Sequence, residues 1–253
     1  MPNLNVVTIT RPNFDVATYL GSLALAHAVD YMRAHGLTVD DLSGADAVPA
    51  KVLDSLSRRD PVFFTGVGHG NESVFTGQNL ERIWWVCDCS QLRGRVVYLL
   101  SCLTGQQLGP DMVNNKGAWC YVGYKVEFTW IQESIQDPTV DRYGRAFFEP
   151  VLELICRLAD GRTVGEAFRA SIDKWNSWID YWSRSSDPVA PAIVMFLLLD
   201  RDGQVLIGDE NARVTSAVPP PWWLLSALGA IAPIGAVISV VGSEELRKAG
   251  VRF

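Results

Sequence analysis

Two side chains capable of nucleophilic and acid–base chemistry each stand at the end of a short apolar stretch. His69 closes the stretch within residues 61–70, and Cys102 closes residues 95–102. A cysteine attacks as its thiolate, and an adjacent imidazole is a common base for removing the thiol proton. If the fold brings His69 and Cys102 together, the pair can carry out covalent catalysis.

The two apolar stretches predict the elements that position this pair. Each is rich in apolar and β-branched residues without alternation, which is typical of a strand buried on both faces of a parallel sheet. In open α/β sheets, ligands bind beyond the carboxyl ends of the strands. If the two strands are neighbours, an imidazole and a thiol face each other at that edge.

The first half of the chain alternates strands and helices. We expect a strand at 4–10, helices at 14–35 and 49–59, the strands ending at His69 and Cys102, a helix opening within 103–110 and ending near 116, and a strand at 118–124. The segment 37–42 is short and acidic, and a polar loop is expected at 71–78. The pattern of residues 80–86 fits a helix or a strand. This alternation predicts a parallel, doubly wound sheet.

The second half predicts two helices followed by a hairpin. The helices are expected at 143–158 and 163–182, the second opening with a capping box from Thr163 to Glu166. The wholly apolar run 193–199 ends in a turn signal at 200–203, and residues 205–209 would form the return strand.

Composition limits the class of function. The 253 residues are 48% hydrophobic and 20% charged, which suits a folded core. A net charge of −6 without a basic stripe argues against a nucleic-acid partner. Five cysteines, an odd number, favour a reduced compartment, and the N-terminus lacks signal-peptide features. We therefore expect a cytoplasmic protein, or one associated with a membrane on its cytoplasmic side.

The C-terminal segment differs from the rest in carrying no charge from 217 to 242. It is long enough to cross a bilayer, and Trp222 and Trp223 suit an interfacial belt. The alternative is a helical hairpin packed on the domain or on a partner. We therefore divide the chain into a domain at 1–213 and a hydrophobic tail at 214–253.

The motifs resemble the caspase, legumain, separase and gingipain group of cysteine peptidases. The resemblance rests on Gly68-His69-Gly70 and Ser101-Cys102, each after a hydrophobic strand. Residues 64–70, 99–105 and 117–124 are most similar to the gingipain branch, and Gly208-Asp209 after an apolar strand is similar to the end of its catalytic domain. The likeness covers roughly residues 4–213. It implies a three-layer caspase-like α/β sandwich with a mostly parallel central sheet, to which the apolar tail is added.

This resemblance also implies roles for individual residues. Cys102 would be the nucleophile, and His69 would protonate the leaving amine and then activate water. The backbone N–H groups of Gly70 and Cys102 would form the oxyanion hole. A dyad suffices in this group, so the lack of an obvious third member in the sequence is no objection, and no cofactor is expected. The partner would be a peptide or protein substrate.

Substrate choice in relatives depends on a pocket beside the catalytic strands. Lys125, Glu127 and Trp130 follow the third motif strand and are candidates to line it. Glu127 pointing inward would favour a basic P1 residue, whereas Lys125 would favour an acidic one. Asp60 and Glu72 are further acidic candidates. We expect Arg or Lys at P1, as in gingipains.

Two alternatives stay open. The chain could be a catalytically silent scaffold or binding module that kept this fold and acts through its hydrophobic tail, and an oligomer is compatible with either function. Cys87-Asp88-Cys89 suggests a metal site, but structural zinc needs about four ligands and no second pair is apparent. We expect no metal.

Overall fold

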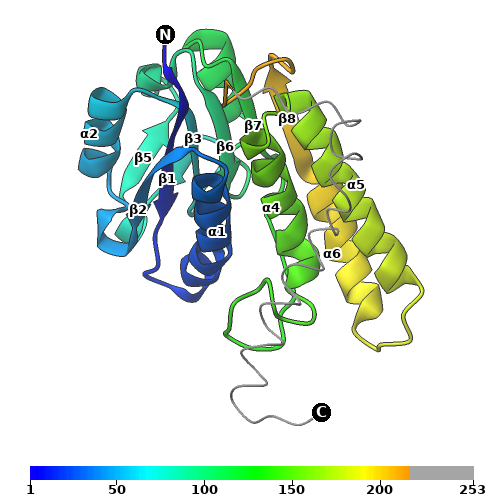
Figure 1. Cartoon of the computed structure of the whole chain (residues 1–253). Helices are drawn as coiled ribbons and strands as arrows, with labels where there is room; N and C mark the ends of the chain where they lie inside the picture. Colours follow the sequence, from blue (N-terminus) through cyan, green and yellow to red (C-terminus); the bar gives the residue numbers. More distant parts are fainter. Residues whose placement is uncertain (217–253) are drawn as a thin grey trace. The chain divides into compact units, whose positions relative to one another are not determined.

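The computed structural model describes residues 1–216, and its centre is a six-stranded sheet in the order β2-β1-β3-β6-β7-β8 (Figure 1). All neighbouring strands are parallel except β8, which runs antiparallel to β7. The strands of this sheet are β1 Asn3–Arg11, β2 Thr38–Ser43, β3 Pro61–Val67, β6 Val96–Leu100, β7 Cys120–Tyr124 and β8 Gln204–Gly208. The mixed α/β fold with a mostly parallel sheet agrees with the prediction.

Helices and a small hairpin cover both faces of the sheet. One face packs against α1 Val16–Ala34, α4 Arg145–Ala159, α5 Val164–Ser183 and α6 Ala190–Gly203. The opposite face packs against α2 Pro49–Arg59, the antiparallel pair β4 Val74–Thr76 and β5 Arg82–Trp85, and the short helix α3 Leu108–Pro110, which continues as a π-helical turn at Asp111–Asn115. Single 3₁₀ turns occur at Gly44–Asp46, Gln78–Leu80 and Ser90–Leu92.

The two motif strands lie in the buried middle of the sheet, together with β7. Every residue of β3 and of β6 is buried, which explains their uninterrupted apolar sequence. The strands are direct neighbours, paired from Phe63 with Val96 to Val67 with Leu100. Because both end at the same edge, His69 and Cys102 emerge side by side in the sheet order.

One predicted strand is wrong. The apolar run 193–199 was expected as a strand, but it belongs to helix α6, and only β8 is a strand. Ala190, Ile193, Leu197 and Asp200 are buried while Met195 and Leu199 are exposed, which is helical spacing. A short run without a polar face carries no period, so its pattern could not separate the two structures.

Two polar segments also form strands. The acidic segment near residues 37–42 is β2, an edge strand whose partner is β1. The expected loop at 71–78 contains β4, and the undecided segment 80–86 contains its partner β5. β2 lies at the edge of the main sheet, and β4 and β5 form a small hairpin outside it that still buries Phe75, Ile83 and Trp84.

The hydrophobic segment 217–242 lies outside the described residues, as does nearly all of the predicted tail 214–253. Val214 is buried, and its carbonyl accepts a hydrogen bond from the Asn5 N–H of β1. Among residues 1–216, no helix is both long and apolar enough to cross a membrane.

Candidate active site

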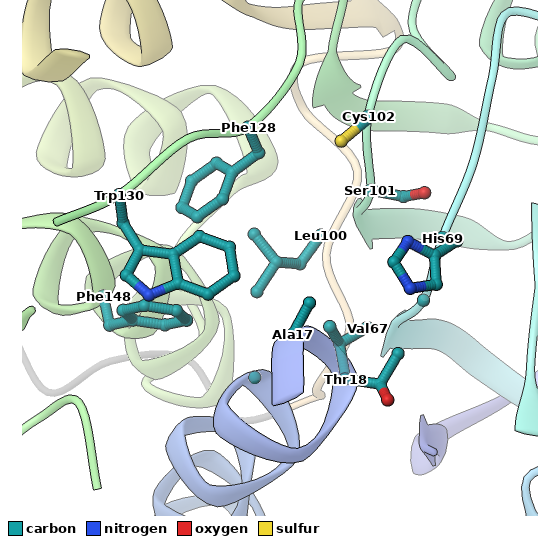
Figure 2. Close-up of a pocket in the computed structure, with 12 residues that line it drawn as sticks. Ala17, Thr18, Val67, His69, Leu100, Ser101, Cys102, Phe128, Trp130 and Phe148 are labelled. Atoms are coloured by element: carbon teal, nitrogen blue, oxygen red, sulfur yellow. The ribbon is translucent and has the colours of Figure 1, made fainter. Parts of the chain in front are cut away.

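His69 and Cys102 lie at the carboxyl edge of the sheet, just beyond β3 and β6. Both line one cavity, which is shown in Figure 2. In that view the Cys102 sulfur points toward Phe128, and the His69 ring lies near the start of α1. The fold therefore brings the two motif residues to one site, as their sequence contexts predicted.

Asp15 is a third member of this site that the sequence analysis did not identify. Its Oδ2 lies 2.6 Å from Nε2 of His69, and both side chains are partly exposed. Asp15 follows β1, the neighbour of β3 on the side away from β6. The carboxylate, the imidazole and the thiol thus come from the ends of three adjacent parallel strands.

Asp15 is held in place by its second role as the N-cap of α1. Its Oδ1 accepts hydrogen bonds from the backbone N–H and the hydroxyl of Thr18, both at 2.8 Å. The Thr18 hydroxyl in turn accepts from the Asp15 N–H at 3.2 Å, completing a capping box. One oxygen of the carboxylate therefore fixes the helix while the other orients His69.

The charge of Asp15 determines which nitrogen of His69 carries the proton. Burial opposes ionisation of Asp15, but hydrogen bonds from Thr18 and His69 outweigh it and lower the pKa of this carboxyl. An ionised carboxylate only accepts, so Nε2–H of His69 donates to it. Nδ1 is then the basic nitrogen, and Figure 2 shows it on the side of Ser101 and Cys102.

The surroundings of the Cys102 thiol oppose its ionisation. Burial raises its pKa, and the nearby charges of Glu127 and Asp200 add to this, while a hydrogen bond from the backbone of Phe128 acts in the opposite direction. Among the hydrogen bonds of residues 1–216, none joins the thiol to His69. Leu103, the next residue, has a φ of +61°, a left-handed conformation uncommon for a bulky side chain.

Gly70 packs too closely against Ser101 and Cys102 for any side chain. A Cβ at this position would lie 2.3 Å from Ser101 Oγ and 3.0 Å from the carbonyl oxygen of Cys102. The flanking His69 carbonyl and Asn71 N–H bond to the β4 hairpin, and Gly70 pairs with Phe75 between them. The N–H of Gly70 therefore points away from that hairpin.

The cavity has a volume of about 200 Å³ and is mostly apolar. Ala17, Thr18 and Gly21 of α1 form one side, and Val67, Gly68 and Leu100 belong to or follow the motif strands. Phe128, Trp130 and Phe148 form an aromatic wall, and His69, Ser101 and Cys102 complete the lining. An aromatic wall opposite a thiol and an imidazole is suited to binding a substrate group beside reactive atoms.

The three residues proposed for substrate binding occupy different places. Trp130 lines the cavity. Lys125 and Glu127 are exposed and are not among its lining residues. Their part in substrate binding stays a prediction. Asp60 lies beyond the opposite end of β3, where it pairs with Arg95 at 2.8 Å.

Sequence comparison gives no assignment: no family model and no curated protein matches this chain. Comparison with solved structures finds proteins with a similar fold. The Arg-specific cysteine proteinase gingipain R matches with a TM-score of 0.55 and 10% identity, covering 83% of this chain and 48% of its own. The complex of RgpB pro- and mature domains from Porphyromonas gingivalis matches with a TM-score of 0.52 and 10% identity, covering 86% and 50%.

The mostly parallel six-stranded sheet with helices on both faces is a caspase-like α/β fold. More particularly, the chain has the gingipain-like form of this fold, which confirms the resemblance. The chain spans about half the length of the structures that it matches. At this level of identity the likeness concerns the fold alone.

Proposed function

We propose that this protein is a cysteine endopeptidase that uses Cys102 as nucleophile and His69 as general base and acid. One observation carries the proposal. The Asp15–His69 pair and Cys102 lie at the ends of three adjacent strands, and the imidazole and the thiol line the same cavity. Fold likeness to cysteine proteinases supports it.

The reaction follows from the protonation states of the site. Nδ1 of His69 takes the Cys102 proton as Sγ attacks the peptide carbonyl carbon, and the carbonyl π electrons move to its oxygen. The tetrahedral intermediate collapses, its C–N bond breaks, and His69 returns the proton to the leaving amine. His69 then removes a proton from water, which attacks the thioester, and the departing thiolate regains a proton.

Asp15 acts on this reaction through His69. It orients the ring, fixes the tautomer and stabilises the imidazolium that forms during attack. Because the raised pKa of Cys102 keeps the thiol protonated at neutral pH, the step needs a base at the moment of attack. The dyad expected from sequence becomes a triad in this proposal.

The negative charge on the carbonyl oxygen requires hydrogen-bond donors. We assign the backbone N–H groups of Gly70 and Cys102 to this role, as the resemblance implies. Support comes from the direction of the Gly70 N–H, which points away from the β4 hairpin, and from the absence of a side chain at this position.

A basic P1 preference was expected if Glu127 faced the substrate. That residue is exposed and does not line the cavity, so the geometry lends this preference no support. The cytoplasmic location and a membrane-associated tail remain predictions.

The test is digestion of a mixture of denatured proteins, in which the new termini are identified by mass spectrometry. Wild type should release peptides, Cys102→Ala should release none, and His69→Ala should be slower by at least about 100-fold. Equal digestion by Cys102→Ala would disprove the assignment. No digestion by a folded wild type would favour the silent scaffold instead.

A further inference from the structure

The cavity beside Cys102 offers no charged partner to a substrate side chain. Its lining contains no carboxylate and no ammonium or guanidinium group. Asp15, the partner of His69, has one oxygen occupied by Thr18 and the other by His69. A cation placed here would lose its hydration without gaining a counter-ion, which is costly.

The uncharged polar groups of the lining are few. The hydroxyl of Thr18 is bonded to Asp15, and Nε2 of His69 is bonded to the same carboxylate. Ser101 is buried, and its Oγ has no hydrogen-bond partner within residues 1–216. This hydroxyl and Nδ1 of His69 are both uncharged, and they cannot replace the water shell of a guanidinium or an ammonium group.

The aromatic wall gives the cavity its shape. The Trp130 and Phe148 rings meet edge to face with centroids 5.5 Å apart, and the Phe128 and Phe148 rings meet in the same way at 5.9 Å. Aromatic rings prefer such edge-to-face or offset contacts, so a further ring would find favourable neighbours here.

The size of the cavity suits one side chain. Its volume of about 200 Å³ lies below the roughly 300–1,000 Å³ of pockets that hold whole small molecules. An apolar cavity of about 150 Å³ in a protein core is known to accept benzene. A phenyl ring or a branched aliphatic chain would therefore fit.

The first two turns of α1 keep the opposite wall uncharged and close. Ala17 and Gly21 line it from successive turns. A Cβ at Gly21 would lie 2.6 Å from Cγ2 of Val67, so glycine allows the helix to pack directly against β3. No long or charged side chain projects from this part of α1 into the cavity.

From these observations we infer that the cavity is a specificity pocket for an uncharged apolar P1 residue, with phenylalanine and leucine preferred over arginine and lysine. The inference rests on the proposed function and names the substrate class of the same site. It replaces the expectation of a basic P1 residue with a preference derived from the lining.

The test has two arms that use peptides identical except for Phe, Leu, Arg, Lys or Asp at P1. In the first arm, wild-type kcat/KM is measured on fluorogenic versions. In the second arm, the Cys102→Ala variant binds the unlabelled peptides without cleaving them, and its Kd for each peptide is measured by calorimetry. We expect Phe to exceed Arg by at least about 100-fold in kcat/KM and to bind more tightly.

A charge variant sharpens the first arm. Ala17→Glu places a carboxylate on the cavity wall and should raise the Arg-to-Phe ratio of kcat/KM at least about 10-fold. Tyr19→Glu adds the same charge to the same helix at an exposed position outside the lining and should leave that ratio unchanged. Using the ratio removes any general effect of the new charge on His69.

The outcomes separate the two proposals. Turnover or binding of Arg or Lys peptides equal to that of Phe peptides overturns the apolar pocket and leaves the peptidase intact. Preferential binding of Phe and Leu peptides without any turnover supports the pocket and overturns the peptidase. Neither turnover nor binding of any peptide overturns both.

Discussion

The molecule contains two histidine–aspartate pairs with nearly the same geometry in different surroundings. His69 Nε2 lies 2.6 Å from Asp15 Oδ2, and His27 Nε2 lies 2.6 Å from Asp137 Oδ2. The imidazoles are also similarly accessible, with 42% and 50% of their side-chain surfaces exposed. Neither distance nor exposure distinguishes one pair from the other.

The residues that surround each histidine distinguish the two pairs. His69 shares a cavity with a thiol and precedes a glycine whose backbone N–H is directed away from the hairpin. His27 lies on the middle of α1 and contacts only Asp137 and the Thr139 hydroxyl through the hydrogen bonds of its Nε2. A histidine–aspartate pair alone therefore only orients the imidazole. Catalysis also requires a nucleophile and a site that binds the substrate.

The largest expected difference concerns the histidines themselves. His69→Ala removes the base and should lower kcat/KM by about 10³-fold, within the range for loss of a general acid–base group. His27→Ala, the matched control, should change it less than about twofold. The measurement is hydrolysis of a P1-Phe peptide by both purified variants. Comparable losses in both would show that the pairs are not functionally distinct.

The second largest difference is expected between the carboxylates of Asp15 and Asp137. Asp15→Asn keeps a good N-cap for α1 but removes the charge that fixes the His69 tautomer, so kcat should fall by about 100-fold with little change in thermal stability. Asp137→Asn should leave kcat unchanged. Circular dichroism melts accompany the kinetics. A large loss of stability in Asp15→Asn, with kcat intact in the folded fraction, would show that Asp15 acts only as a helix cap.

The His27–Asp137 pair should instead affect the free energy of unfolding. Its hydrogen bond to Asp137 raises the pKa of His27 above the usual 6.5, against the opposing effect of burial. A raised pKa means that the contribution is fully present below pH 6.5 and is lost as pH rises through the pKa of the folded protein. Asp137, whose pKa is lowered, loses its contribution only at lower pH, below 3.8.

Urea unfolding of wild type and His27→Gln measures this effect. The difference in unfolding free energy should be larger at about pH 5.5 than at about pH 9, by under about 1 kcal/mol because the pair is exposed. Asp137→Asn should show the same trend. A difference that grows toward pH 9 would contradict the sign.

The smallest effect concerns the thiol. The negative charge of Glu127 contributes to the raised pKa of Cys102, so Glu127→Gln should shift the pH profile of Cys102 alkylation toward lower pH. Glu133→Gln, an exposed acid farther along the same loop, is the control. An unchanged profile in Glu127→Gln would remove this residue from the electrostatics of the site.

Much of the site was predictable because it depends on local pattern. Two mainly apolar stretches ending in His69 and Cys102 predicted buried parallel strands, and the sheet pairing of β3 with β6 supplied the adjacency that the sequence left as a condition. Asp15 was missed because its role depends on the strand order, which places β1 beside β3 although the residues are far apart in sequence. The available signal was an aspartate at the start of the helix after the first strand.

Other features could not be obtained from the sequence. Helix α6 lacks a polar face strong enough to show its period, so it resembled a buried strand. The pocket lining depends on which side chains after β7 turn inward. Phe128 and Trp130 do so, whereas Glu127, the residue just before Phe128, stays exposed. Tertiary packing decides such orientations.

The central claim is that Cys102 is a nucleophile served by His69, and one labelling experiment tests it most directly. A P1-Phe acyloxymethyl ketone peptide is reacted with wild type and with Cys102→Ala, His69→Ala and His27→Ala, and the modified cysteine is located by mass spectrometry. We predict a single rapid adduct on Cys102, absent in Cys102→Ala, slowed in His69→Ala and unchanged in His27→Ala. Equal labelling of all four proteins, or an adduct on the exposed Cys87, would contradict the account.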